Sequence, residues 1–202
     1  MLPRLYAILD TSYFCDRDLL LLTAEHLAAG GVSLLQYRNK SGNAWQMLEQ
    51  SRELKRCLGG SVKLIMDDRA DLCVAAGLDG VHVGQDDLSP AGARRVVGET
   101  LLLGVSTHNL EQVRDADRTP ADYLAIGPVF STVSKANPDP VIGLEGVRAA
   151  RALTRKPLVA IGGINRANCR AVIEAGADSV AVISDLVREP RKSAEDFFRI
   201  LG

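Results

Sequence analysis

The sequence predicts an α/β protein, a single-domain (β/α)8 TIM barrel that spans residues 1–202. Short apolar runs rich in Val, Ile and Leu recur along the chain, and segments of helical periodicity lie between them. No Pro/Gly/Ser-rich linker or low-complexity tract divides the 202 residues. Buried strands that alternate with helices indicate a parallel sheet covered by helices. Eight such units lie at the compact end of the size range of this barrel.

The expected strands are the eight apolar runs, in order Leu5–Leu9, Val32–Tyr37, Val62–Met66, Gly80–Val83, Leu101–Val105, Tyr123–Ile126, Leu158–Ile161 and Ser179–Val182. Segments with helical periodicity include Leu19–Ala29, Trp45–Leu58, Leu144–Leu153 and Ala167–Ala175. Ala-Gly motifs that begin at Ala29, Ala76 and Ala175 directly precede strands. Because glycine suits the left-handed residue that ends many helices, these motifs are interpreted as architecture.

The composition excludes several classes of partner. Lys and Arg total 24 against 25 Asp and Glu, so the net charge is −1 and no basic field exists to hold nucleic acid or a membrane surface. No apolar run approaches the ~20 residues that span a bilayer, and a signal-peptide layout is lacking. The expected partners are small phosphorylated substrates, the expected location is cytoplasmic, and homo-oligomer formation stays open.

The cysteines carry no metal-type spacing. They are scattered through the chain at Cys15, Cys57, Cys73 and Cys169. They are interpreted as reduced thiols, with a catalytic thiol as the lesser alternative.

Polar residues follow the second expected strand at alternating positions. Gln36, Arg38 and Lys40 are each two residues apart. If the strand continues to its end, these side chains share one face. A parallel barrel keeps its active site at the carboxyl ends of its strands, so two cations and an amide would converge there.

Carboxylates end the neighbouring strands. Asp68 follows the third strand and Asp87 the fourth, so both can reach one point. Mg²⁺ usually takes only one or two protein carboxylates. The alternative is that Asp68 caps the next helix and Asp87 caps the turn before Pro90. For Asp10, at the end of the first strand, capping or a rim position is favoured over a ligand contact.

The later strands end in groups that suit anions. Ser106 and His108 follow the fifth strand, and His108 is either a proton shuttle or a passive cap. The long loop Gly127–Pro140 carries Thr132, Ser134 and Lys135, and such loops are often lids or binding loops. Backbone N–H groups after the seventh and eighth strands, at Gly162-Gly163 and Ile183-Ser184, match the recurrent phosphate site of such barrels.

Six motifs in order carry a resemblance to a known family. They are Gln-x-Arg-x-Lys at Gln36–Lys40, Asp-Asp-Arg at Asp67–Arg69, His-x-Gly-Gln-x-Asp at His82–Asp87, Gly-x-Ser-x-His at Gly104–His108, Gly-Pro-x-Phe-x-Thr-x-Ser-Lys at Gly127–Lys135, and Gly-Gly-Ile at Gly162–Ile164. Over nearly its full length the chain resembles the family that thiamine-phosphate synthases share with thiazole tautomerases.

The resemblance implies a transferase, a thiamine-phosphate diphosphorylase that uses Mg²⁺. Such an enzyme condenses 4-amino-2-methyl-5-hydroxymethylpyrimidine diphosphate with thiazole phosphate and forms thiamine monophosphate and diphosphate. The family is thought to lose diphosphate dissociatively, through a pyrimidine carbocation that the thiazole nitrogen captures. Cations near the leaving group stabilise its growing charge without a dedicated nucleophile.

The resemblance also implies a role for each motif position. The pyrimidine diphosphate would be held by Gln36, Tyr37, Arg38, Asn39, Lys40, Asp67, His82, Ser106 and Lys135. Of these, Arg38, Lys40, Ser106 and Lys135 would be the catalytic residues. The thiazole phosphate would be held by Thr132, Val133, Ser134, Gly163, Ile183 and Ser184. Asp68 and Asp87 would bind Mg²⁺.

One position departs from the family pattern. The family usually has Asn immediately before the first metal carboxylate, and here that residue is Asp67. An ionised carboxylate only accepts hydrogen bonds, whereas an amide can also donate one to a diphosphate. We expect Asp67 to pair with Arg69 or Lys63, or to join the metal shell.

Three other functions are compatible with parts of the sequence. A thiazole tautomerase would need the site after the seventh and eighth strands but not the full set of cations and metal carboxylates. A non-catalytic sensor of a phosphorylated metabolite would tolerate a degraded metal pair. Another phosphate-handling barrel enzyme, such as an isomerase of tryptophan biosynthesis, would leave the metal carboxylates unexplained.

Overall fold

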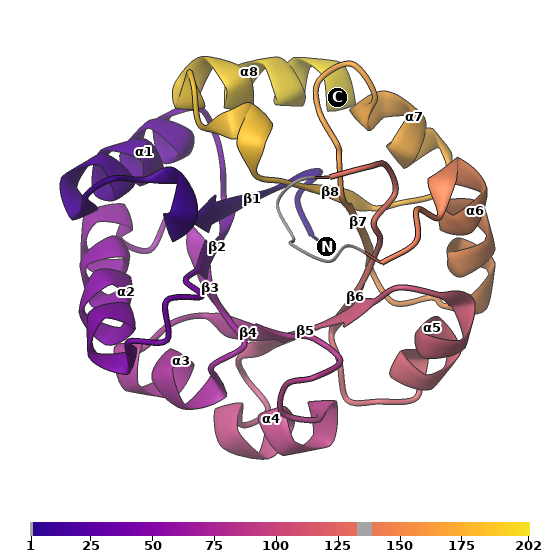
Figure 1. Cartoon of the computed structure of the whole chain (residues 1–202), viewed down its shortest axis with the longest axis horizontal. Coiled ribbons are helices and arrows are strands. Elements are labelled where there is room, and N and C mark those ends of the chain that lie inside the picture. Colours follow the sequence, from indigo (N-terminus) through magenta and orange to yellow (C-terminus); the bar gives the residue numbers. More distant parts are fainter. Residues whose placement is uncertain (1, 133–138) are drawn as a thin grey trace.

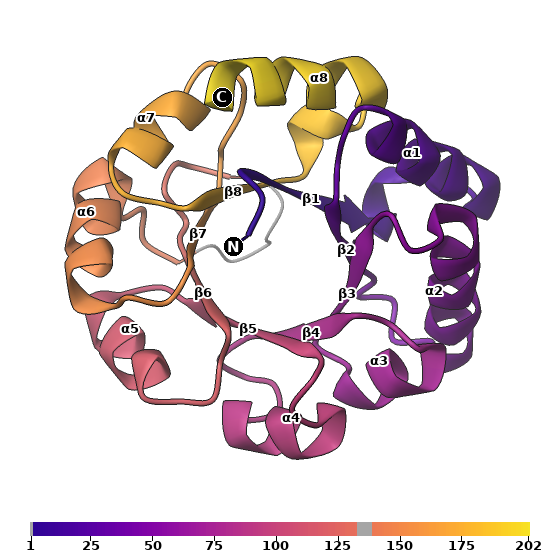
Figure 2. The same cartoon turned by 180° about the vertical axis from the view of Figure 1, so that it is seen from behind.

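Eight parallel strands close into a barrel with helices around it (Figure 1). The computed structural model describes residues 2–132 and 139–202. Each strand pairs with its neighbours in sequence, and β1 pairs with β8 to close the ring. Viewed from behind, the helices again surround the strands on all sides (Figure 2). The predicted (β/α)8 fold is confirmed.

The strands lie where the apolar runs predicted them. They are β1 Leu5–Asp10, β2 Leu34–Arg38, β3 Lys63–Asp67, β4 Gly80–Val83, β5 Leu102–Thr107, β6 Tyr123–Ile126, β7 Leu158–Ile161 and β8 Ser179–Val182. Two boundaries affect the site. β2 ends at Arg38, so Lys40 lies beyond the strand. β5 continues to Thr107, which places Ser106 inside the ladder, opposite Ala125 of β6.

The helices fill the connections between strands. They are α1 Arg17–Ala29, α2 Ala44–Leu58, α3 Ala70–Ala76, α4 Pro90–Val97, α5 Leu110–Asp117, α6 Gly143–Leu153, α7 Cys169–Glu174 and α8 Pro190–Leu201, with 3-10 turns η1 Thr11–Tyr13 and η2 Ser184–Leu186. Side-chain caps fix the starts of α1 and α2: Asp16 accepts from Leu19 N, and Asn43 accepts from Gln46 N.

One predicted helix is shorter than expected. The segment Ala167–Ala175 yields only α7, which begins at Cys169. Asn165 and Asn168 cause the late start, because their side chains bond to nearby backbone N–H groups. Asn168 Oδ1 accepts from Asn165 N at 2.8 Å, and Asn165 Oδ1 accepts from Ala167 N at 2.9 Å. Such local bonds favour a turn over a helix.

Apolar residues form two separate cores. The larger core lies between the strands and the helices. The smaller core fills the barrel interior and includes Tyr6, Ile8, Ile65, Tyr123 and Val159, with Leu2 packed against it. Ala125 and Ala181 also face this interior. Their small side chains leave space above the inner core, and a cavity occupies that space.

Two exclusions from the sequence can be compared with the structure. None of the helices in residues 2–132 and 139–202 is long and apolar enough to cross a membrane. None of the four cysteines lines the cavity described below. Cys73 is buried, and burial raises the pKa of its thiol to about 12. A catalytic thiol therefore has no support.

Candidate active site

A cavity of about 590 Å³ lies at the carboxyl ends of the strands. A site of this volume suits a small organic ligand. Apolar residues of β1, β6, β7 and β8 form its floor, among them Ile8, Ala125, Val159 and Ala181. Its wall includes the polar residues Gln36, Arg38, Lys40, Asp67, Asp68, His82, Asp87, Ser106, Thr132, Gly163 and Ser184. These positions come from nearly every strand end, as the barrel geometry predicted.

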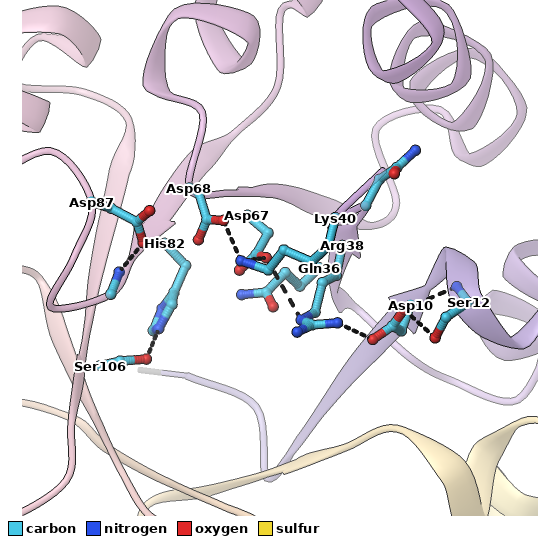
Figure 3. A network of polar contacts seen from close by, with 12 residues as sticks. Asp10, Ser12, Gln36, Arg38, Lys40, Asp67, Asp68, His82, Asp87 and Ser106 are labelled. Atoms are coloured by element: carbon cyan, nitrogen blue, oxygen red, sulfur yellow. Dashed lines mark hydrogen bonds and ion pairs between the residues drawn. The ribbon is translucent and has the colours of Figure 1, made fainter. Parts of the chain in front are cut away.

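Arg38 is held between two carboxylates. Its Nη1 forms an ion pair with Asp10, which lies opposite Arg38 in the β1–β2 register, and its Nε lies 3.7 Å from Asp67 Oδ2 (Figure 3). Asp10 also accepts from Ser12 N at 3.0 Å and Ser12 Oγ at 2.7 Å. The capping position expected for Asp10 is confirmed, and the same carboxylate fixes the Arg38 guanidinium.

Lys40 reaches the same cluster from beyond the end of β2. Its Nζ lies 3.0 Å from Asp67 Oδ2 and also pairs with Asp68 (Figure 3). Burial opposes the charge on Lys40, but the two carboxylates outweigh it and raise the Lys40 pKa. The expected pairing of Asp67 with Arg69 or Lys63 is wrong. Arg69 instead pairs with Asp71 on the helix side.

Asp67 is the more buried of the two carboxylates that Lys40 contacts. Its side chain is only 10% exposed. Burial raises the Asp67 pKa, against the opposing charges of Lys40 and Arg38. Although both cations lie nearby, Asp67 Oδ2 accepts no hydrogen bond of ordinary geometry among the described residues. The ion pairs with Lys40 and Arg38 therefore compensate the charge of this buried oxygen.

Asp68 adopts a rare backbone conformation. Its φ is +60°, and Arg69 N donates to Asp67 O at 2.7 Å, which makes a γ-turn centred on Asp68. With φ positive this is the strained form of the turn, and such strain often occurs at functional sites. The capping alternative for Asp68 is wrong, because α3 begins after Arg69 with no side-chain cap.

Asp87 faces Asp68 from the loop after β4 (Figure 3). Partial burial raises the Asp87 pKa, and the nearby Asp68 carboxylate raises it further. Asp87 Oδ2 also accepts from Gly84 N at 2.8 Å, so it caps its own turn. The cap of the following helix is a different residue, Ser89, which accepts from Gly92 N. Asp68 and Asp87 therefore meet at one point.

The donor set fits Mg²⁺. Within residues 2–132 and 139–202, no group of three or more His, Cys, Asp or Glu side chains is arranged to hold a metal. A pair of carboxylates is nonetheless what Mg²⁺ commonly uses, since water and substrate phosphates complete its coordination. The Lys40 ammonium already lies against Asp68, which shows that this point attracts positive charge. Asp68 and Asp87 are the residues that would hold the ion.

A hydrogen-bonded chain crosses the barrel below the carboxylates. Gln36 Nε2 donates to Tyr6 Oη at 3.1 Å, and Tyr6 Oη lies 3.0 Å from Tyr123 Oη. Tyr123 Oη lies 3.1 Å from His82 Nδ1, and His82 Nε2 lies 2.8 Å from Ser106 Oγ. Burial lowers the His82 pKa to about 4, so its imidazole is neutral near pH 7.

The opposite side of the cavity is lined by residues that follow β6, β7 and β8. Thr132, Gly163, Ile183 and Ser184 all line it. The loop after β6 packs directly on Gly163, because a Cβ there would lie 2.8 Å from Phe130 Cβ and would also clash with Ser131 O. The predicted residues Val133, Ser134 and Lys135 lie outside the described residues.

His108 ties together the two described ends of that loop. Its Nδ1 lies 2.8 Å from Gly127 O and 3.5 Å from Asp139 Oδ2. His108 also lines the cavity. The position therefore combines a structural contact with access to a ligand.

Two predicted contacts point away from the cavity. Tyr37 and Asn39 are absent from its lining. Tyr37 Oη donates to Gln50 Oε1 of α2 at 2.5 Å, and Asn39 Nδ2 donates to Tyr37 Oη at 3.0 Å. Because Gln36 and Arg38 face inward, the residues between and after them face the helices.

Other cavity residues were missed by the sequence analysis. Gln85 lines the cavity, and its Nε2 donates to Ser106 O at 2.6 Å. Tyr6 lines it from β1, and Tyr123 supports it from β6. Gln85 belongs to the His-x-Gly-Gln-x-Asp motif, which was a usable signal. The tyrosines lie in apolar runs and carry only the weak signal of a phenol in a buried strand.

Comparison with known proteins gives one consistent family. The family described as thiamine monophosphate synthase matches residues 5–186. The chain is 62% identical over 203 residues to a thiamine-phosphate synthase from Koribacter versatilis, which covers 99% of this chain and 96% of that protein. It is 45% identical over 185 residues to the Chloroflexus aurantiacus thiamine-phosphate synthase, which covers 91% and 85%.

The chain belongs to the thiamine monophosphate synthase family. It is an enzyme of the transferase class. A solved structure from this family, thiamine phosphate pyrophosphorylase from Pyrococcus furiosus, superposes with a TM-score of 0.87 at 32% identity and covers 98% of this chain and 95% of that one. The family resemblance drawn from the six motifs is therefore confirmed.

Proposed function

We propose that this enzyme condenses 4-amino-2-methyl-5-hydroxymethylpyrimidine diphosphate with thiazole phosphate, with Mg²⁺ at Asp68 and Asp87. The products are thiamine monophosphate and diphosphate. The supporting observation is the meeting of Asp68 and Asp87 beside Lys40 and Arg38 at the cavity mouth. A divalent ion and two cations at one point suit a diphosphate group.

The proposed chemistry is electrostatic. As the bond between carbon and diphosphate breaks, the leaving group gains negative charge that Arg38 and Lys40 can stabilise. Mg²⁺ bound at Asp68 and Asp87 would neutralise further charge on the same group. At an effective dielectric of ~20, one pair of unit charges at 4 Å gains about 4 kcal/mol. The loss of one such contact would thus lower the rate by roughly two to three powers of ten.

The site also offers groups for the other reaction partners. Ser106 and Gln36 reach the cavity from neighbouring parts of the wall and suit the pyrimidine diphosphate. Thr132, Gly163 and Ser184 lie on the opposite side and suit the thiazole phosphate. Lys135 stays a prediction from the sequence, because it lies outside the described residues.

The alternatives raised by the sequence explain less of this site. A tautomerase that binds only a thiazole phosphate has no use for the Asp68–Asp87 pair or for Lys40. A sensor would need no strained carboxylate, yet Asp68 holds a positive φ at the point where the charges meet.

The deciding experiment combines purified protein, both substrates and Mg²⁺, and assays thiamine monophosphate. We expect product with Mg²⁺ and none after EDTA is added. Incubation with the thiazole substrate alone tests the tautomerase activity. Calorimetric titration of Mg²⁺ into the wild type and Asp87→Asn, with inorganic diphosphate present, tests the metal site without turnover. Equal Mg²⁺ affinity in both proteins would contradict the assignment of Asp87.

A further inference from the structure

Five side chains from five strands form an unbroken hydrogen-bonded chain inside the barrel. It runs from Gln36 on β2 through Tyr6 on β1, Tyr123 on β6 and His82 on β4 to Ser106 on β5. The two tyrosines are at most 2% exposed and His82 is 7% exposed. Buried polar hydrogens of this kind need acceptors, so the direction of each bond can be worked out.

The five side chains of this hydrogen-bonded chain have a limited number of O–H and N–H hydrogens. Burial raises the pKa of both Tyr6 and Tyr123, so each phenol keeps its O–H. A neutral His82 ring carries one N–H, on either Nδ1 or Nε2, and a ring protonated on both nitrogens would have to donate to Tyr123 just as the Nδ1 form does. At the far end, Gln36 Nε2 donates to Tyr6 Oη. With the Gln36 amide oriented as the structure has it, this donor sets the starting direction.

With Gln36 donating to Tyr6, only one placement of the imidazole proton satisfies every buried donor. With the proton on Nε2, Tyr6 donates to Tyr123, Tyr123 donates to Nδ1, and Nε2 donates to Ser106 Oγ. With the proton on Nδ1, Tyr123 must accept from His82. One phenolic O–H then has no acceptor among the described residues. An unsatisfied buried donor is costly enough to bias the two tautomers at least about tenfold.

We propose that Tyr6 and Tyr123 are positioning residues that fix the His82 proton on Nε2 and so leave the Ser106 hydroxyl hydrogen to donate to an anionic oxygen in the cavity. Ser106 then accepts from His82 and donates to the ligand. In the reverse direction Ser106 would donate its hydrogen to His82 and could only accept a hydrogen bond from a ligand. That state would repel a phosphate oxygen, which offers acceptors alone.

Gly104 makes room for this arrangement. It lies between His82 and Tyr123 in the registers of β4, β5 and β6. A Cβ at Gly104 would overlap the Tyr123 phenol and His82 Nδ1. The missing side chain lets the two rings lie with centroids 5.5 Å apart.

The direct test is the tautomer of His82. The chain has three histidines, so ¹⁵N-imidazole NMR of the full chain near neutral pH can resolve each ring, with His26→Gln to aid assignment. We expect His82 to carry its proton on Nε2. A proton on Nδ1 would overturn the proposal, whatever reaction the enzyme catalyses.

Variants distinguish an effect of the hydrogen-bond direction on the His82 tautomer from an effect of side-chain packing. Tyr123→Phe removes the donor to Nδ1, so we expect both tautomers to become populated. Ser106→Ala removes only an acceptor and should leave the proton on Nε2. Tyr37→Phe, which removes another buried hydroxyl on the outer side of β2, is the control and should leave the His82 signals unchanged. A tautomer change in Ser106→Ala but not in Tyr123→Phe would also overturn the proposal.

A second measurement connects the chain to the ligand, and this part depends on the proposed function. We expect Tyr123→Phe to lower turnover about tenfold when it is the only substitution. In a protein that already carries Ser106→Ala, it should lower turnover by less than about twofold. Without Ser106, the hydrogen-bonded chain no longer reaches the ligand. The turnover losses of Tyr123→Phe and Ser106→Ala should therefore not multiply. Independent, multiplying losses would contradict the link to Ser106. A protein without synthase turnover would contradict the proposed function instead, while the NMR result would still decide the tautomer.

Discussion

The two sides of the cavity are built by different means. On the side of β2, β3 and β4, charged side chains surround one point: Arg38, Lys40, Asp67, Asp68 and Asp87. On the side of β7 and β8, the wall is made of Gly163, Ile183 and Ser184, with few side-chain charges. The first side depends on which charges are present. The second is shaped by the close packing of Gly163 against Phe130 and Ser131.

The largest expected effect comes from the charged side. Asp87→Ala should lower Mg²⁺-dependent turnover by roughly a hundredfold or more, because half of the carboxylate pair is lost. Steady-state assays over a range of Mg²⁺ concentrations measure the loss, and circular dichroism checks the fold. Asp71→Ala, on the exposed helix side, is the control. Full activity in Asp87→Ala would show that the side of β2, β3 and β4 does not depend on this charge.

A smaller effect is expected on the side of β7 and β8. Gly163→Ala should raise the KM for thiazole phosphate about tenfold, because the new Cβ pushes the loop at Phe130 and Ser131 away from its place. The KM for the pyrimidine diphosphate should change by less than about twofold. Gly59→Ala is a matched control, since Gly59 also has a positive φ but open space around it. Equal changes in both KM values would show that the sides are not separate.

The backbone of the charged side can be tested by two substitutions at Asp68. Asp68→Gly and Asp68→Ala both remove the carboxylate and should both lower turnover about as much as Asp87→Ala. Only glycine relieves the positive φ, so Asp68→Gly should be more stable than Asp68→Ala by about 1 kcal/mol. Urea unfolding of the two variants measures the difference. Equal stabilities would show that the turn at Asp68 holds no strain.

The smallest effect is expected at Asp67, where the change should be visible mainly in stability. Burial raises the folded-state pKa of this carboxyl above its usual value of 3.8. Its contribution to stability is therefore complete below pH 3.8 and is lost as the pH rises through the folded-state pKa. Asp67→Asn should unfold at a higher temperature than the wild type near pH 8, and the gap should shrink toward pH 4.

Turnover of the same variant gives a second check. Asp67→Asn should keep the wild-type activity, because the amide can still lie beside Lys40 and can donate to a diphosphate. A large loss of activity would show that the extra carboxylate is used in the reaction. A stability gap that grows toward low pH would contradict the raised pKa.

The sequence was informative where strand geometry alone decides position. The barrel rule places Gln36, Arg38, Asp68, Asp87 and Ser106 at one end of the sheet, and the structure has them lining one cavity. The same alternation could have excluded Tyr37, since its neighbours face inward. Within Gln36–Lys40, the structure places only the alternate residues Gln36, Arg38 and Lys40 at the cavity.

Other features depend on side chains that cross between strands, and no local pattern encodes these. Lys40 lies beyond β2, yet its long side chain brings it back to Asp67 and Asp68. Arg69, adjacent to Asp67 in sequence, points to Asp71 instead. Tyr6 and Tyr123 are 117 residues apart and meet only because the barrel closes.

Closure of the ring has a consequence for how the chain folds during synthesis. The last seam joins Leu5 of β1 to Val180 of β8, so β1 lacks one neighbour until β8 has been made. Contacts of such long sequence separation form slowly, because a large loop must be ordered first. On the ribosome, β1 therefore presents an unpaired backbone edge, which is open to wrong pairing until β8 emerges.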